Sequence, residues 1–184
     1  VSLTVDKGDV VVILGPSGSG KTTIARYLCD MFGMTQIDSY TTRAPRYHGE
    51  TGHTFVTEEE FDQLTDMVAF TLFNGYRYCA TSQQVDENDI YVIDVNGVEY
   101  FKRAYTGKKT IKVFYFTVPE SKVIQRMLKR GDGYEDVMER IRNDDVMFAN
   151  ALTRLRAVYD DVYEIENVNI ADTAKEIMRI LKEE

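Results

Sequence analysis

Residues 10–22 read VVVILGPSGSGKT, an apolar run followed at once by a glycine-rich loop that ends in Gly-Lys-Thr. The run 10–14 is typical of a strand that is buried on both faces of a parallel sheet. Apolar side chains then recur at helical spacing across 23–32, and Gly33 supplies a helix stop. A strand, a glycine-rich turn and a helix are the context in which this pattern forms a phosphate-binding loop.

The chemistry of such a loop lies mainly in its backbone. Glycines leave room for a polyphosphate, and the backbone N–H groups and the helix N-terminus direct partial positive charge at it. We expect Lys21 to reach the outer phosphates and Thr22 to offer its hydroxyl to Mg²⁺. The loop therefore predicts binding of ATP or GTP with Mg²⁺, through Gly15, Ser17, Gly18, Ser19, Gly20, Lys21, Thr22 and Thr23.

Length and composition limit the class of protein. A chain of 184 residues suits one domain, and 43% hydrophobic residues can form a substantial core. The net charge of −8 argues against a general nucleic-acid binder. The two cysteines and two histidines are dispersed, so we expect neither a disulfide framework nor a zinc site, and a reducing cytoplasm is the default location. No apolar run approaches the roughly 20 residues of a membrane span.

Strand and helix patterns alternate over much of the chain. We expect strands at 1–5, 90–95, 112–117 and 162–165, and helices at 58–64, 120–129, 134–159 and 171–183. Such alternation is typical of an α/β domain with a mostly parallel central sheet flanked by helices. The middle of the chain departs from it, because apolar runs at 67–73 and 77–80 flank Asn74-Gly75, a strong hairpin signal. Residues 38–88 are therefore expected to form a small β-rich insertion.

A second informative stretch is residues 39–46, which read SYTTRAPR. Two arginines three residues apart, beside hydroxyls and a proline, suit a second phosphate group, because a guanidinium offers a planar fork of donors. Taken alone, such a stretch is more often an exposed loop whose arginines are solvated.

The two motifs in this order resemble the guanylate kinase family, and the resemblance continues through 53–61, 78–82, 93–98, 126–142 and 159–167. It implies a P-loop kinase with a core at 1–37, 89–125 and 146–184, a substrate-binding insertion at about 38–88 and a helical lid at about 126–145. It also implies ATP-dependent phosphoryl transfer to a nucleoside monophosphate, with GMP the leading acceptor.

The resemblance also assigns roles by position. The residues that would hold the acceptor phosphate are Arg43, Arg46, Tyr78 and His53, the last in place of a family tyrosine, with Ser39 and Asp94 near the acceptor base. The lid arginines on the migrating phosphoryl group would be Arg126, Arg130 and Arg140, and Asn167 would lie near the adenine. The expected catalytic residues are thus Lys21, Arg43, Arg130 and Arg140.

The acceptor base pocket departs from the family pattern. Ala69 stands where the family has a guanine-reading glutamate, and Ala80 replaces the usual serine or threonine. Loss of a charged hydrogen-bond partner costs about 1.5–3 kcal/mol, which is enough to remove a preference for guanine. Glu50 or Thr81 could substitute for the missing group, or the acceptor could be another phosphorylated small molecule, such as ribose 1,5-bisphosphate.

Two other functions stay open. A scaffold module of the same fold would bind peptides without catalysis; the altered base pocket favours it, whereas Lys21 and Thr22 oppose it. The ATPase domain of a transporter shares the opening strand and loop, but the chain lacks the Ser-Gly-Gly-Gln signature of that class. The sequence does not distinguish a monomer from a homodimer.

Overall fold

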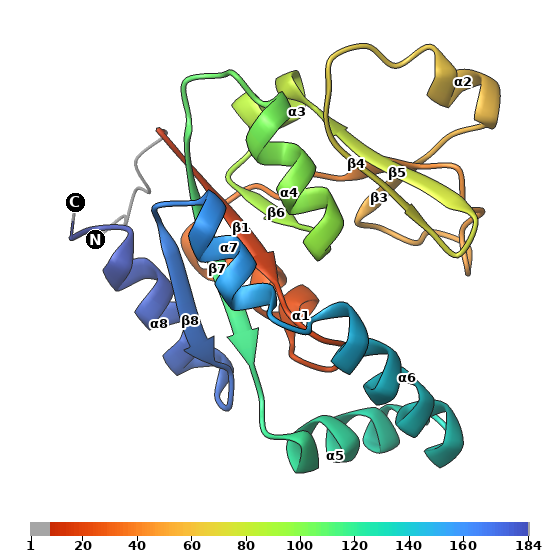
Figure 1. The fold of residues 1–184 in the computed structure, drawn as a ribbon, viewed down its shortest axis with the longest axis vertical. Helices are drawn as coiled ribbons and strands as arrows, with labels where there is room; N and C mark the ends of the chain where they lie inside the picture. The colour runs from red at the N-terminus through yellow and green to blue at the C-terminus, as the bar shows by residue number, and fades with distance from the viewer. Residues whose placement is uncertain (1–7, 184) are drawn as a thin grey trace.

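The centre of the computed structural model, which describes residues 8–183, is a four-stranded parallel sheet (Figure 1). Its strand order is β6-β1-β7-β8, with β1 at Asp9–Leu14, β6 at Ile90–Val92, β7 at Thr110–Thr117 and β8 at Val162–Glu166. The predicted α/β class, a parallel sheet flanked by helices, is therefore confirmed. The strand expected at 1–5 lies outside the described residues.

Strand β1 shows why both faces of this sheet are covered. Residues 10–14 are fully buried, and consecutive side chains of a strand point to opposite faces. Val11 and Ile13 pack with α1 (Lys21–Phe32) and α8 (Ile170–Ile180). Val10, Val12 and Leu14 pack on the other face with α4 (Val95–Ala104) and α7 (Ala151–Val158).

The carboxyl ends of the parallel strands lie at one edge of the sheet, which is where open α/β sheets bind ligands. At this edge β1 leads into the glycine-rich loop 15–20, and β8 is followed by Asn167. β6 leads to Asp94, whose carboxylate caps α4 by accepting from the Gly97 N–H at 2.7 Å. The topology thus brings three predicted site segments to one edge.

A second four-stranded sheet is built inside the segment 38–88. Its order is β3-β2-β5-β4, with β2 at Ser39–Thr41, β3 at His53–Phe55, β4 at Met67–Phe73 and β5 at Tyr76–Thr81. The expected hairpin is confirmed: Asn74 and Gly75 have φ of 50° and 79°, the signs that a type I′ turn requires. The short helices α2 (Glu58–Asp62) and α3 (Ser82–Glu87) each begin with a capping box.

Helices α5 (Glu120–Arg130) and α6 (Tyr134–Met147) lie at the opposite end of the molecule from this second sheet (Figure 1). They pack together through a small apolar cluster that consists of Val123, Met127, Val137 and Ile141. Among the described residues, no helix has the length and apolar character needed to span a bilayer.

Several predicted elements extend further than the observed ones, and two of these differences have a clear cause. The helix expected over 134–159 is two helices, because Asn150 between α6 and α7 adopts a left-handed φ of 57°, which asparagine tolerates. The strand expected at 90–95 ends at Val92, because Asp94 already caps α4. The prediction also missed α4 and α3 as helices.

The packing of α1 predicts that two apolar side chains of this helix contribute differently to the free energy of unfolding. Leu28 is fully buried against the sheet, whereas Met31 is 62% exposed. We expect Leu28→Ala to lower the free energy of unfolding by about 2–5 kcal/mol, because it leaves a cavity in the core. The matched control Met31→Ala should change it by less than about 0.5 kcal/mol. Urea denaturation measures both, and equal losses would contradict this packing.

Candidate active site

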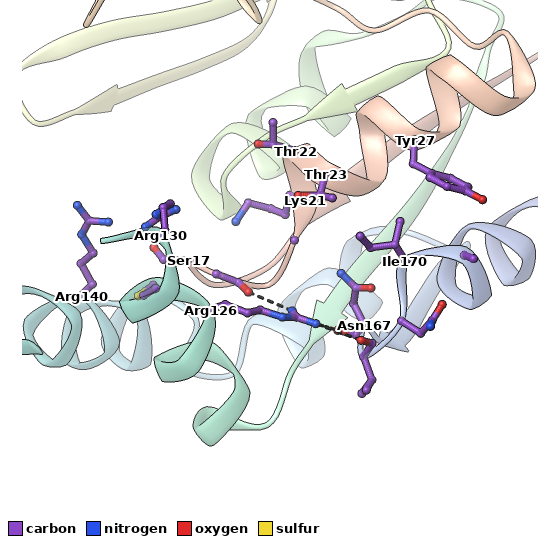
Figure 2. Close-up of a pocket in the computed structure, with 16 residues that line it drawn as sticks. Ser17, Lys21, Thr22, Thr23, Tyr27, Arg126, Arg130, Arg140, Asn167 and Ile170 are labelled. Atoms are coloured by element: carbon purple, nitrogen blue, oxygen red, sulfur yellow. Dashed lines mark hydrogen bonds between the residues drawn. The ribbon is translucent and has the colours of Figure 1, made fainter. Parts of the chain in front are cut away.

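A cavity of about 920 Å³ opens over the glycine-rich loop (Figure 2). Its walls come from the loop, the start of α1, helices α5 and α6, and the turn between β8 and α8. The predicted residues that line it are Ser17, Gly18, Gly20, Lys21, Thr22, Thr23, Arg126, Arg130, Arg140 and Asn167. Gly15 and Ser19 are buried within the loop.

The shape of the loop requires glycine at two positions. Gly18 and Gly20 have φ of 74° and 90°, which side chains rarely allow. A Cβ at Gly18 would lie 3.1 Å from Val123 of α5, and one at Gly20 would collide with Nδ2 of Asn167. The loop is therefore in direct contact with the elements that surround the cavity.

The side chains of Asn167 and Arg126 hold the glycine-rich loop in place through hydrogen bonds to its carbonyl oxygens. Asn167 is 1% exposed; its Nδ2 donates to the Ser19 carbonyl at 2.6 Å, and its Oδ1 accepts from the Thr173 hydroxyl at 2.9 Å. Arg126 donates to the Gly18 carbonyl at 3.2 Å and to the Asn167 carbonyl at 2.7 Å, as the dashed lines in Figure 2 show. Asn167 thus supports the loop as well as lining the cavity, a role that the sequence did not reveal.

The positive groups of the loop already have protein partners. The Lys21 ammonium donates to the carbonyl oxygens of Gly15 at 2.7 Å and of Pro16 at 3.0 Å. Burial lowers the pKa of Lys21 to about 8, and the Asp144 carboxylate opposes this shift. Ser17 N–H donates to Oδ2 of the same Asp144, on α6, at 2.7 Å. No sequence motif marked Asp144 as part of the site.

The groups around the cavity fit a polyphosphate with a hard divalent cation. The exposed Thr22 hydroxyl lines the cavity, and Ser19 Oγ is buried without a hydrogen-bond partner in the part of the chain that the structure describes. Within residues 8–183 no cluster of three or more His, Cys, Asp and Glu side chains could hold a metal. A magnesium ion here would therefore depend on Thr22 and on oxygens of the phosphates.

Two arginines enter the cavity from α5 and α6. Arg130 and Arg140 are about half exposed, and both pair with Asp132 in the turn between the helices. The Arg130 guanidinium lowers the pKa of Asp132. The pairs are solvent-exposed and so hold the arginines weakly, which leaves both free to reach an anion in the cavity.

The residues predicted for the acceptor phosphate gather in the second sheet. Arg43 donates to the two carboxylate oxygens of Glu50 at 2.8 and 3.2 Å, and Glu50, followed by Tyr78, raises the pKa of the Arg43 guanidinium. His53 Nδ1 lies 2.9 Å from the Ser39 hydroxyl, and its ring centroid is 5.7 Å from that of Tyr78. Arg43, Ser39, His53 and Tyr78 therefore form one polar cluster.

Glu50 joins this cluster through its ion pair with Arg43. Its carboxylate also accepts from the Arg46 backbone N–H at 2.6 Å, whereas the Arg46 side chain is exposed. The hydrogen bonds from Arg43 and Arg46 lower the pKa of Glu50 to about 2, so it is ionised at neutral pH. The structure thus pairs Glu50, one of the two substitutes considered for reading a base, with Arg43. The Thr81 hydroxyl, the other substitute considered, accepts from the Gln84 N–H at the start of α3.

Ala69 and Ala80, which stand where the family reads guanine, lie in apolar and closed surroundings. Ala69 and Ala80 are paired between β4 and β5, and they are 2% and 0% exposed. Both belong to the core cluster that contains Val68 and Tyr91. Methyl groups offer no hydrogen bond to a base, and Asp94 is engaged at the N-terminus of α4.

The lowered pKa of Lys21 predicts how nucleotide binding depends on pH. Phosphates favour the charged ammonium, so ATP affinity should be constant up to about pH 8. Above that pH it should fall by up to tenfold per unit, because a proton must be taken up on binding. Calorimetry at pH 7, 8 and 9 measures this. Lys21→Arg stays charged and should not show the fall; a constant wild-type affinity to pH 9 would contradict the shift.

The chain is similar to known kinases along nearly its whole length. Residues 11–146 match the protein-family profile described as an AAA domain. Guanylate kinase from Clostridium perfringens is 32% identical over 96% of this chain and 83% of its own length. Guanylate kinase from Thermotoga maritima is 30% identical over 97% of this chain and 88% of its own length.

A solved structure agrees with these similarities in sequence. The crystal structure of guanylate kinase from Anaplasma phagocytophilum matches with a TM-score of 0.65 and 25% identity, over 96% of this chain and 85% of that one. By sequence similarity, by fold and by its glycine-rich phosphate loop, this chain belongs to the guanylate kinase family of P-loop kinases.

Proposed function

We propose that this protein transfers a phosphoryl group from Mg·ATP to a nucleoside monophosphate, with GMP the leading acceptor. The observation that carries the proposal is the presence of two separate sets of anion-binding groups in one chain. One is the phosphate loop with Lys21, which lines the large cavity; the other is the cluster around Arg43 and Tyr78. The guanylate kinases named above support the choice of donor and acceptor.

The proposed donor site accounts for the charge of the triphosphate. Phosphoryl transfer requires alignment and charge neutralisation more than a protein nucleophile. The loop N–H groups and Lys21 would hold the β- and γ-phosphates. Thr22 Oγ1 would hold Mg²⁺, which when bound neutralises further negative charge on the phosphate oxygens. Arg126 and Asn167 would keep the loop in this arrangement.

The lid, residues 126–145, would supply the groups that act during transfer. Arg130 and Arg140 would exchange Asp132 for the oxygens of the migrating phosphoryl group. Closure of the lid over the core, which we assign to 8–37, 89–125 and 146–183, would exclude water that otherwise hydrolyses ATP. The core expected from the sequence also includes 1–7 and 184, which lie outside the residues that the structure describes.

The insertion, residues 38–88, would bind the acceptor. Arg43 Nε is buried and, among the described residues, lacks a hydrogen-bond partner, so the guanidinium keeps a donor for a phosphate oxygen. Tyr78 and His53 would add hydrogen bonds, and Arg46 could fold in from solvent. This assignment leaves the rest of the acceptor recognised mainly by shape.

A second acceptor class is favoured by the buried methyl groups of Ala69 and Ala80. Because they read no base, another phosphorylated small molecule, such as ribose 1,5-bisphosphate, would fit the same phosphate cluster. A non-catalytic binding module is the other alternative, and absence of Mg·ATP binding in calorimetry would favour it.

An ADP-release assay tests the proposal across GMP, dGMP, AMP, UMP, CMP and ribose 1,5-bisphosphate. We expect GMP to be turned over well above background ATP hydrolysis. The variant Arg43→Met should lower kcat/KM for GMP by about 10- to 100-fold, because it removes a charged hydrogen bond to the acceptor phosphate.

The matched control is Arg179→Met, which removes an exposed arginine of α8 that pairs with Glu176 and with Glu183 beyond the helix. It should leave turnover unchanged. No turnover of any acceptor would overturn the proposed activity, and faster turnover of ribose 1,5-bisphosphate than of GMP would select the second acceptor class.

A further inference from the structure

Asp144 links the lid to the phosphate loop. Its Oδ2 accepts from Ser17 N–H at 2.7 Å, across 127 residues of chain. Ser17 belongs to the loop whose backbone N–H groups favour anions, and a carboxylate on such a group forms a charge-assisted hydrogen bond. The protein therefore supplies an anion of its own to its anion-binding loop.

The packing of the lid determines where this carboxylate lies. Asp144 follows Ile141 by three residues and so lies on the same face of α6. Ile141 packs with Val123 and Met127 of α5. These two side chains lie close to Gly18 of the loop: a Cβ at Gly18 would be 3.1 Å from Val123 and 3.3 Å from Met127. The apolar cluster of the lid thus rests on the loop and brings Asp144 to Ser17.

Asp144 also lies close enough to Lys21 to affect its charge. Its carboxylate favours the protonated ammonium, against the effect of burial. One side chain thus interacts with two of the positive groups that a triphosphate would use, the Ser17 N–H and the Lys21 ammonium. The Asp144 carboxylate and a phosphate oxygen cannot both occupy the Ser17 N–H without repulsion.

We propose that Asp144 is an internal competitor of the donor phosphates, which holds the lid on the empty loop and is displaced when a triphosphate binds. The carboxylate lowers the affinity for the triphosphate and couples its arrival to release of α6 from the loop. This inference deepens the proposed kinase function, but it concerns the binding of phosphate alone and needs no acceptor.

Binding of inorganic tripolyphosphate without Mg²⁺ tests the proposal by calorimetry at pH 7. Asp144→Asn keeps the shape of the side chain and removes its charge. We expect it to bind tripolyphosphate more tightly than the wild type by about fivefold or more, because the competing charged hydrogen bond is lost. The matched control is Asp145→Asn, at an exposed neighbouring position, which should change the affinity by less than about twofold.

Unchanged or weaker binding by Asp144→Asn would overturn the proposal, because a carboxylate that only shapes the lid does not compete with phosphate. Urea denaturation checks that each variant is folded. If Asp144→Asn is not folded, Asp144→Ser replaces it in the comparison of tripolyphosphate affinity with the wild type. A failed GMP assay with tighter tripolyphosphate binding would reject the proposed acceptor and keep this inference. Turnover of GMP, together with unchanged or weaker tripolyphosphate binding by Asp144→Asn, would reject this inference and keep the proposed kinase function.

Discussion

A hydrogen bond of 2.6 Å from the Asn167 side chain to the Ser19 carbonyl ties the loop after β1 to the turn after β8. Arg126 adds bonds from α5 to the same loop and to the same turn. A backbone that binds phosphate must keep its N–H groups directed at the ligand, and these hydrogen bonds hold the loop in one conformation. The sheet positions the loop, and the buried polar bonds give it a fixed shape before a ligand arrives.

The charges around this scaffold follow a common pattern. Asp144 contacts the phosphate loop and Glu50 contacts Arg43, so a carboxylate of the protein lies at each proposed phosphate site. Positive groups left unpaired in partly buried sites are costly, and an internal carboxylate offsets that cost while no ligand is bound. The two pairs differ in strength: Arg43 and Glu50 are joined by two hydrogen bonds, whereas Asp144 accepts from one backbone N–H.

The sequence predicted the elements that follow a regular pattern. The buried run before the loop, the helix after it and the Asn-Gly hairpin all lie where they were expected, because each depends on local spacing or turn chemistry. The break at Asn150 was missed because it interrupts a helical pattern by one residue's conformation. Asp144 and the supporting role of Asn167 were missed because both depend on contacts between segments far apart in the chain, which no local pattern reports.

The interruption between α6 and α7 has a mechanical consequence. A continuous helix would join the outer end of the molecule rigidly to α7, which packs on the central sheet through Ala151 and Leu155. The left-handed residue at position 150 instead interrupts the helix, so α6 and α7 are separate helices. The helix that contacts the phosphate loop through Asp144 and the helix that covers the sheet are therefore separate units of the fold.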